Sequence, residues 1–133
     1  MEGGCVPGGL PVISYLMVGT NDLPRFVNYF DALMQDMGAT KVYDSPTSTG
    51  WGWGTGTPMF IVGLPFDKKA ASVGNGSMIS FGADSREQVD GLYARALELG
   101  GTSEGEPGLR GETFYAAYFR DPDGNKFNFF CQL

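Results

Sequence analysis

The side chains that most often perform catalysis or hold metal ions are scarce in this chain, which has no histidine among its 133 residues. Its two cysteines, Cys5 and Cys131, lie near opposite ends and do not form the CxxC spacing of a redox or zinc site. Glu104, Glu106 and Glu112 have no spacing that defines an acid–base pair. Covalent catalysis by a Ser–His pair, or by a thiolate that a histidine activates, therefore has no basis in these residues.

Aromatic side chains offer binding chemistry instead. Trp51 and Trp53 lie in the glycine-rich run GWGWGTG at residues 50–56, where the neighbouring glycines cannot bury large rings. Strand alternation places both indoles on one face, which suits stacking on a planar or cationic ligand and equally suits an edge or dimer contact. The run lacks the GxxxxGK[ST] pattern and no strong helix follows it, so we exclude a phosphate-binding loop.

Several further residues are candidates for the wall of a binding cleft. Asn128 is the polar residue of the apolar segment FNFFCQ, and because buried amides need partners we expect it to bond a ligand or a neighbour such as Tyr15. The strand aromatics Tyr15, Phe60, Tyr115 and Tyr118 are cleft candidates too, although aromatic residues on strands also pack protein cores.

A unit that occurs twice positions these residues. Segments 12–40 and 75–103 align without a gap at an offset of 63 residues, and each reads as strand, polar turn, amphipathic helix and glycine stop. The first helix is predicted to be capped by Asn21 or Asp22 and to end at Gly38. The second is predicted to be capped at position 84 or 85 and to end at glycines 100 and 101.

Strand-like segments follow each helix, so each unit reads βαβββ. The expected strands are 12–19, 40–43, 51–55 and 58–64 in the first unit, and 77–83, 102–104, 113–120 and 126–132 in the second. We predict a single α+β domain over residues 1–133. Its tandem modules, about 11–64 and 77–132, are joined by connector 65–76 and form a curved mixed sheet around a half-open cleft, with the helices outside.

The closing segment YAAYFRDPDGNKFNFF, residues 115–130, has a strong hairpin signal in DPDGN, where Pro122 presets φ and Gly124 or Asn125 accepts a positive φ. Together with the duplicated units and the opening VISYLMVGTNDLPRFVNYFDALMQDMGAT, it resembles the vicinal-oxygen-chelate superfamily from about residue 11 to 132. That superfamily includes glyoxalase I, bleomycin-resistance proteins and extradiol dioxygenases. The resemblance implies their fold, but it does not decide among their activities.

The resemblance also implies where the superfamily's His and Glu metal ligands would lie. The positions correspond to Tyr15 and Met78 on the first strand of each unit and to Asn128 on the last strand, with Phe60 or Val62 as the fourth. Phenol, aromatic ring, thioether and amide do not form a tight site for Mg, Mn, Fe, Ni or Zn. We therefore predict no metal in the cleft and no cofactor.

The acidic balance of the chain limits its partners. A net charge of −6 and a pI of about 4.4 argue against nucleic acid, because the chain repels phosphate backbones. No segment approaches the ~20 apolar residues that span a bilayer, so we predict no membrane partner. The start MEGGCVPGGLP does not read as a signal peptide, and we expect a cytoplasmic protein with free thiols.

The sequence thus predicts a glyoxalase/bleomycin-resistance-like homodimer that binds a small aromatic, amphipathic or cationic molecule without metal. The predicted cleft residues are Tyr15, Trp51, Trp53, Phe60, Val62, Met78, Tyr115, Tyr118 and Asn128, and no catalytic residue is assigned. The alternatives are a lyase, isomerase or dioxygenase-type enzyme with atypical groups, and a module that contacts a protein partner through the two tryptophans.

Overall fold

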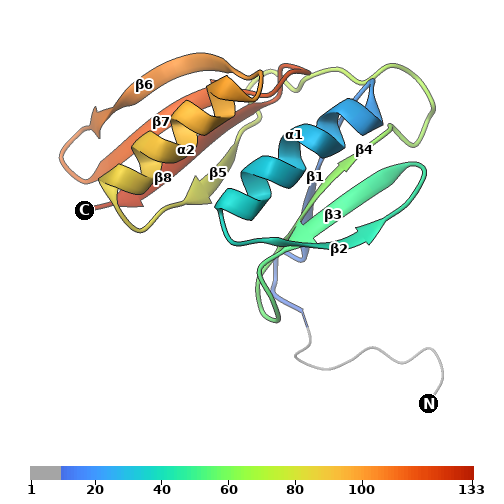
Figure 1. Cartoon of the computed structure of the whole chain (residues 1–133), viewed down its shortest axis with the longest axis horizontal. Coiled ribbons are helices and arrows are strands. Elements are labelled where there is room, and N and C mark those ends of the chain that lie inside the picture. Colours follow the sequence, from blue (N-terminus) through green and yellow to red (C-terminus); the bar gives the residue numbers. More distant parts are fainter. Residues whose placement is uncertain (1–9) are drawn as a thin grey trace.

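The computed structural model describes residues 10–133, so Cys5 lies outside the described residues. It contains two βαβββ units in succession (Figure 1). The first comprises β1 (Tyr15–Gly19), α1 (Leu23–Asp36), β2 (Thr40–Asp44), β3 (Ser48–Gly52) and β4 (Met59–Gly63). The second comprises β5 (Ile79–Gly82), α2 (Arg86–Glu98), β6 (Thr102–Arg110), β7 (Phe114–Arg120) and β8 (Lys126–Gln132).

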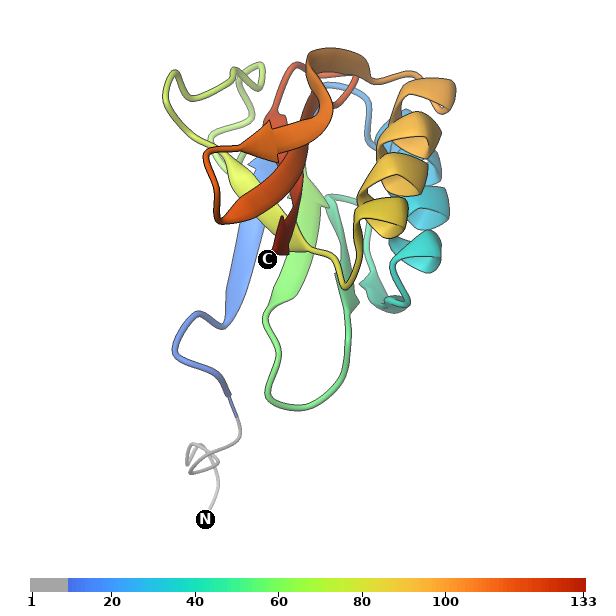
Figure 2. The ribbon, with the colours of Figure 1, turned by 90° about the vertical axis from the view of Figure 1, so that its left-hand side faces the viewer.

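Each unit forms its own four-stranded mixed sheet, with strand orders β1-β4-β3-β2 and β5-β8-β7-β6. The first strand of each unit pairs in parallel with the last, and the other pairings are antiparallel. Both helices lie on one side of the two sheets, while the connector between the units lies on the opposite side (Figure 2). The predicted α+β fold of tandem βαβββ units is therefore confirmed, with the two helices on the outside.

The predicted helix caps are confirmed, and at each cap the structure selects one of the two candidate residues. The Asp22 carboxylate accepts a hydrogen bond from the Arg25 N–H at 3.3 Å and so begins α1. Ser85 begins α2, because its hydroxyl accepts from the Gln88 N–H at 3.1 Å. Gly38 follows α1 with a φ of +80°, the left-handed conformation that glycine adopts most cheaply.

Strand limits differ from the prediction where glycines interrupt the pattern. The third strand of the first unit was expected at 51–55, but β3 ends at Gly52 because Gly54 and Gly56 adopt positive φ values of 109° and 85° and form the following turn. Strand β1 begins only at Tyr15. The short strand expected at 102–104 extends as β6 to Arg110, with two register shifts against β7.

The hydrophobic core lies between the helices and the sheets and joins the two units. The Phe127 ring of β8 lies 5.6 Å from Phe30 of α1, 5.8 Å from Phe60 of β4 and 5.6 Å from Phe81 of β5, measured between centroids. All four side chains are at most 7% exposed. Because these rings come from both units, the helix-facing sides of the two sheets share one core.

The DPDGN turn between β7 and β8 is held by its first residue. The buried Asp121 carboxylate accepts hydrogen bonds from the backbone N–H groups of Asp123 (3.0 Å) and Asn125 (2.9 Å) and from the Asn125 side chain (2.9 Å). The same Asn125 amide donates to the Gly19 carbonyl at the end of β1 at 3.1 Å. The predicted hairpin is confirmed, and it also fastens the second unit to the first.

The free energy of unfolding is expected to fall as the pH rises from 4 to 6, because Asp121 then loses its proton. Burial raises its pKa from 3.8 to about 6, although the three donated hydrogen bonds favour the ionised form. The folded protein therefore retains a proton that the unfolded chain releases, and this contribution is full below about pH 4 and is lost as the pH rises through 6. The effect is on the order of 3 kcal/mol.

Urea unfolding at several pH values measures this contribution as the difference between wild type and Asp121→Asn. The variant cannot ionise at this position, so its free energy of unfolding is expected to change less steeply across the interval. Parallel pH dependences for the two proteins would show that Asp121 does not titrate with a raised pKa.

Candidate functional site

Each sheet has one face covered by a helix and one face without helices, which we call the bare face. On β1, Tyr15 and Met17 point to the bare face and are 59% and 47% exposed. Their register partners on β4, Met59 and Ile61, share that face. Tyr15 and Met17 thus form an exposed apolar surface beside the partly buried Met59 and the buried Ile61, and contiguous exposed apolar surface often marks a binding site.

An open cavity of about 1070 Å³ lies on the bare face of the first sheet, between the strands and the connector that follows β4. Apolar and aromatic side chains dominate its lining, and hydroxyl, amide and ammonium groups lie among them. The lining residues are Tyr15, Met17, Thr20, Asn21, Tyr43, Thr47, Ser48, Ile61, Leu64, Pro65, Phe66, Lys68, Lys69 and Ala70. An apolar wall with a few polar groups is the usual composition of a small-molecule site.

Two glycines lie beneath side chains that line the cavity. A Cβ at Gly50 would lie 2.5 Å from the Tyr43 ring, and a Cβ at Gly63 would lie 2.7 Å from the Met17 methyl carbon. Glycine at these positions therefore lets the Tyr43 and Met17 side chains lie down on the strands. The Tyr43 hydroxyl is hydrogen-bonded to Ser48 at 2.9 Å, which fixes the orientation of the ring.

The connector that forms the other wall is fastened to the first unit. The Asn21 side chain holds Ala71 at both backbone groups, donating to its carbonyl at 3.2 Å and accepting from its N–H at 2.6 Å. The Leu64 N–H donates to the Thr47 carbonyl at 2.8 Å, and the Lys68 N–H closes a turn on Pro65 at 3.0 Å. These hydrogen bonds thus hold the connector wall in a defined position.

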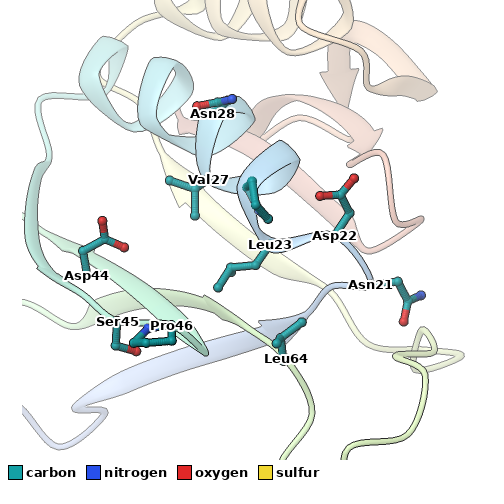
Figure 3. A pocket seen from close by; sticks show the side chains of 10 residues that line it. Asn21, Asp22, Leu23, Val27, Asn28, Asp44, Ser45, Pro46 and Leu64 are labelled. Atoms are coloured by element: carbon teal, nitrogen blue, oxygen red, sulfur yellow. The ribbon is translucent and has the colours of Figure 1, made fainter.

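A second hollow of about 690 Å³ lies between the first turn of α1 and the turn that joins β2 to β3 (Figure 3). Two carboxylates face it, but both have local partners. Asp22 caps α1, and Asp44 accepts from the Thr49 hydroxyl at 2.7 Å. These carboxylates serve the structure around them and present no free acid–base pair.

The structure places both β4 candidates on the helix side of the first sheet. Phe60 and Val62 are each 1% exposed and belong to the core beneath α1, so they do not share the bare face with Tyr15. Side chains alternate along a strand, and the bare-face residue between them is Ile61. Phe60 does reach a separate hollow of about 300 Å³, which lies between the units and also includes Trp53.

Both tryptophans contact α1. The Trp51 indole is 1% exposed and donates to the Asp31 carboxylate at 2.8 Å, so it packs the core. The Trp53 indole donates to the Met37 carbonyl at 3.0 Å and is 37% exposed at the edge of the hollow between the units. They share one face, but it is the helix face, and the cavity of the first sheet includes neither of them.

The candidates of the second unit do not join that cavity. Tyr115 lies on the helix side, where a hydrogen bond to Asp90 raises the pKa of its phenol. Tyr118 and Asn128 are register partners on the bare face of the second sheet. Asn128 is 3% exposed, and within residues 10–133 its Oδ1 has no hydrogen-bond partner. Met78 precedes β5 and borders a small hollow of about 180 Å³.

The comparisons with known proteins agree with this geometry. The family model described as the Glyoxalase/Bleomycin resistance protein/Dioxygenase superfamily matches residues 12–129. The chain belongs to this superfamily. A glyoxalase/bleomycin resistance protein from Albidiferax ferrireducens T118 is 35% identical, with a TM-score of 0.82, and the match covers 90% of this chain and 98% of that one.

More distant members have the same fold. The hypothetical protein SA1046 from S. aureus is 25% identical with a TM-score of 0.73, and the match covers 96% and 95% of the two chains. A lactoylglutathione lyase from Agrobacterium tumefaciens is 20% identical with a TM-score of 0.68 over 90% and 92%, a likeness that shows the fold alone. No curated protein matches the sequence.

The residues of this chain do not fit the metal that the superfamily implies. The corresponding positions hold Tyr15, Met78 and Asn128, with Ile61 on the bare face of β4. Divalent cations prefer carboxylate, imidazole or thiolate ligands. Within residues 10–133, no three His, Cys, Asp or Glu side chains gather in a group that could hold a metal ion. The same part of the chain has no helix with the length and apolar character that crossing a bilayer requires.

Sequence reasoning missed most of the cavity. Met17 could have been found, because it lies two residues after Tyr15 on the same strand and alternation places both on one face. Ile61 depended on the register of β4. The connector residues Phe66, Lys68 and Lys69 carry no sequence signal for a cavity, because only the fold brings residues 65–70 over the sheet.

Proposed function

We propose that this superfamily member binds a small amphipathic molecule in the cavity on the bare face of the first sheet, and that it does so without a metal. One observation carries the proposal. Side chains that a soluble protein usually buries are exposed around one hollow, with Tyr15 at 59%, Met17 at 47% and Phe66 at 101%. Covering them with an apolar ligand would remove this surface from water.

Polar groups around the same cavity give the ligand a fixed orientation. Ser48 pairs with Gly63, and Gly63 pairs with Gly19, the residue before Thr20, so Thr47, Ser48, Thr20 and Asn21 gather at one end of the neighbouring strands. Hydroxyl and amide groups can donate and accept hydrogen bonds, so they can select among ligands of similar shape. No pair of ionisable groups in the cavity lining has acid–base geometry, and the proposal therefore assigns binding and no reaction step.

Filling the cavity from β1 is expected to weaken binding at least tenfold. Met17→Trp places a large ring over Gly63 and Ile61, and it costs little stability because Met17 is already 47% exposed. The measurement is fluorescence titration with the neutral aromatic probe N-phenyl-1-naphthylamine, whose emission rises when it leaves water.

Leu109→Trp is the matched control, because Leu109 is 53% exposed on the second sheet and outside the cavity lining. The control is expected to bind the probe as wild type does. Equal loss of binding in both variants, or no saturable binding to wild type, would overturn the proposal. The homodimer and the cytoplasmic location stay predictions from sequence.

A further inference from the structure

Two lysines at the rim give this cavity a charge opposite to that of the protein. The chain carries 15 acidic and 9 basic residues, yet the cavity lining includes Lys68 and Lys69 and no carboxylate. The four ion pairs within residues 10–133 involve Lys41, Arg95 and Arg120 as the basic partners. The ammonium groups of Lys68 and Lys69 are therefore free to pair with a bound anion.

The backbone of Lys68 supports a role for its side chain. Its φ of +64° is the only positive value of a non-glycine residue in the described part of the chain. Glycine or asparagine adopts this conformation at lower cost, and residues held in it cluster at binding and active sites. The turn is closed by the Lys68 N–H on the Pro65 carbonyl at 3.0 Å, so the lysine projects from a defined corner of the connector.

The nearest acidic residue of the connector is engaged elsewhere. Asp67 lies between Phe66 and Lys68, and its carboxylate accepts from the Lys69 backbone N–H at 3.0 Å. This bond keeps the Asp67 side chain on the turn, and Asp67 is not among the residues that line the cavity. The rim thus keeps the two positive charges of Lys68 and Lys69 beside an apolar floor.

We propose that the cavity selects an amphipathic organic anion, in which a carboxylate or sulfonate group pairs with Lys68 and Lys69 while an apolar body lies over Tyr15, Met17 and Ile61. This rests on the proposed function and narrows its ligand class. It replaces the cationic ligand that the sequence left open, because the two charged residues on the cavity wall are both basic. A cationic ligand would be repelled at this rim.

Two probes that differ by one charged group test the proposal. N-phenyl-1-naphthylamine is neutral, and 8-anilinonaphthalene-1-sulfonate carries a sulfonate on the same aromatic skeleton. Both are titrated against wild type and against the variant Lys68→Asn/Lys69→Gln, in which asparagine tolerates the positive φ of position 68. The variant is expected to bind the anionic probe about tenfold more weakly, as two partly exposed ion pairs would give, and the neutral probe unchanged.

The other two lysines of the chain provide the control. Lys41→Gln/Lys126→Gln changes the net charge by the same amount, but neither residue lines the cavity. This variant is expected to bind the anionic probe as wild type does, and added salt is expected to reduce the difference between the two double variants.

The outcomes separate the two proposals. If wild type binds the neutral probe saturably, and both double variants bind the anionic probe as tightly as wild type does, the anion proposal is overturned and the binding-site proposal stands. If wild type does not bind the neutral probe, both proposals are overturned. An equal drop in anionic-probe affinity in both double variants would show an effect of net charge alone, and this result also contradicts a role for the two rim lysines.

Discussion

Replacing Phe127 by alanine is expected to lower the free energy of unfolding by about 4 kcal/mol, the middle of the usual range for removal of a core aromatic ring. The ring is fully buried, and its centroid lies within 6 Å of four other phenylalanine rings. Two of these, Phe30 and Phe60, belong to the first unit. The loss would therefore open a cavity at the point where the two units share their core.

Urea unfolding followed by tryptophan fluorescence measures this loss, because Trp51 lies in the same core. Phe66→Ala is the matched control, since Phe66 is 101% exposed and its replacement is expected to change stability by less than about 0.5 kcal/mol. Phe127→Leu should fall between the two, because leucine fills part of the space. A loss below about 1 kcal/mol for Phe127→Ala would show that the shared core does not hold the units together.

The elements were predictable because local signals and the repeat agree. Asp22 and Ser85 occupy equivalent places in the two units, and each offers a side-chain oxygen to the third backbone N–H that follows. Asp121 supplies the same kind of local bond in the closing turn. These interactions depend on neighbours in sequence, so one sequence is enough to find them.

The position of a site residue could be predicted only where the side-chain alternation of a single strand determines it. Tyr15 was found, but Phe60 and Val62 were chosen in place of Ile61, because a shift of one residue moves every side chain of a strand to the other face. Gly54 and Gly56, which have positive φ values, end β3 at Gly52 and so put Trp53 beyond the strand. The contribution of Lys68 and Lys69 depends on where the connector crosses the sheet, and no local pattern encodes that.

The alternation of side chains along each strand also separates the core residues from those of the proposed binding site. On β4, Phe60 and Val62 pack the core while Ile61 between them forms the floor of the cavity. On β1, Tyr15 and Met17 face the cavity while Val18 packs against the core. Bare-face residues can therefore change with the ligand while the helix-facing residues keep the fold, which is how one architecture can host many activities.

Gly101→Ala is expected to lower the free energy of unfolding by about 3 kcal/mol or more, although it adds a single methyl group. A Cβ at this position would lie 2.6 Å from the Tyr29 hydroxyl, 2.8 Å from the Arg120 carbonyl oxygen and 2.9 Å from the Ala96 carbonyl oxygen. Two of these atoms belong to the backbone and cannot turn away. The Tyr29 hydroxyl also donates to Ala96 at 3.0 Å, so the clash would break a contact between α1 and α2.

Gly38→Ala is the matched control, because the repeat places Gly38 in the first unit where Gly101 stands in the second. An added Cβ at Gly38 meets nothing within 4 Å, and the cost is only that of alanine at a φ of +80°, about 1 kcal/mol. Adding Tyr29→Phe to Gly101→Ala removes one of the three clashes and should restore only part of the stability. The same urea unfolding experiment compares the variants, and a smaller loss for Gly101→Ala than for Gly38→Ala would show that α2 and β7 do not pack this closely at Gly101.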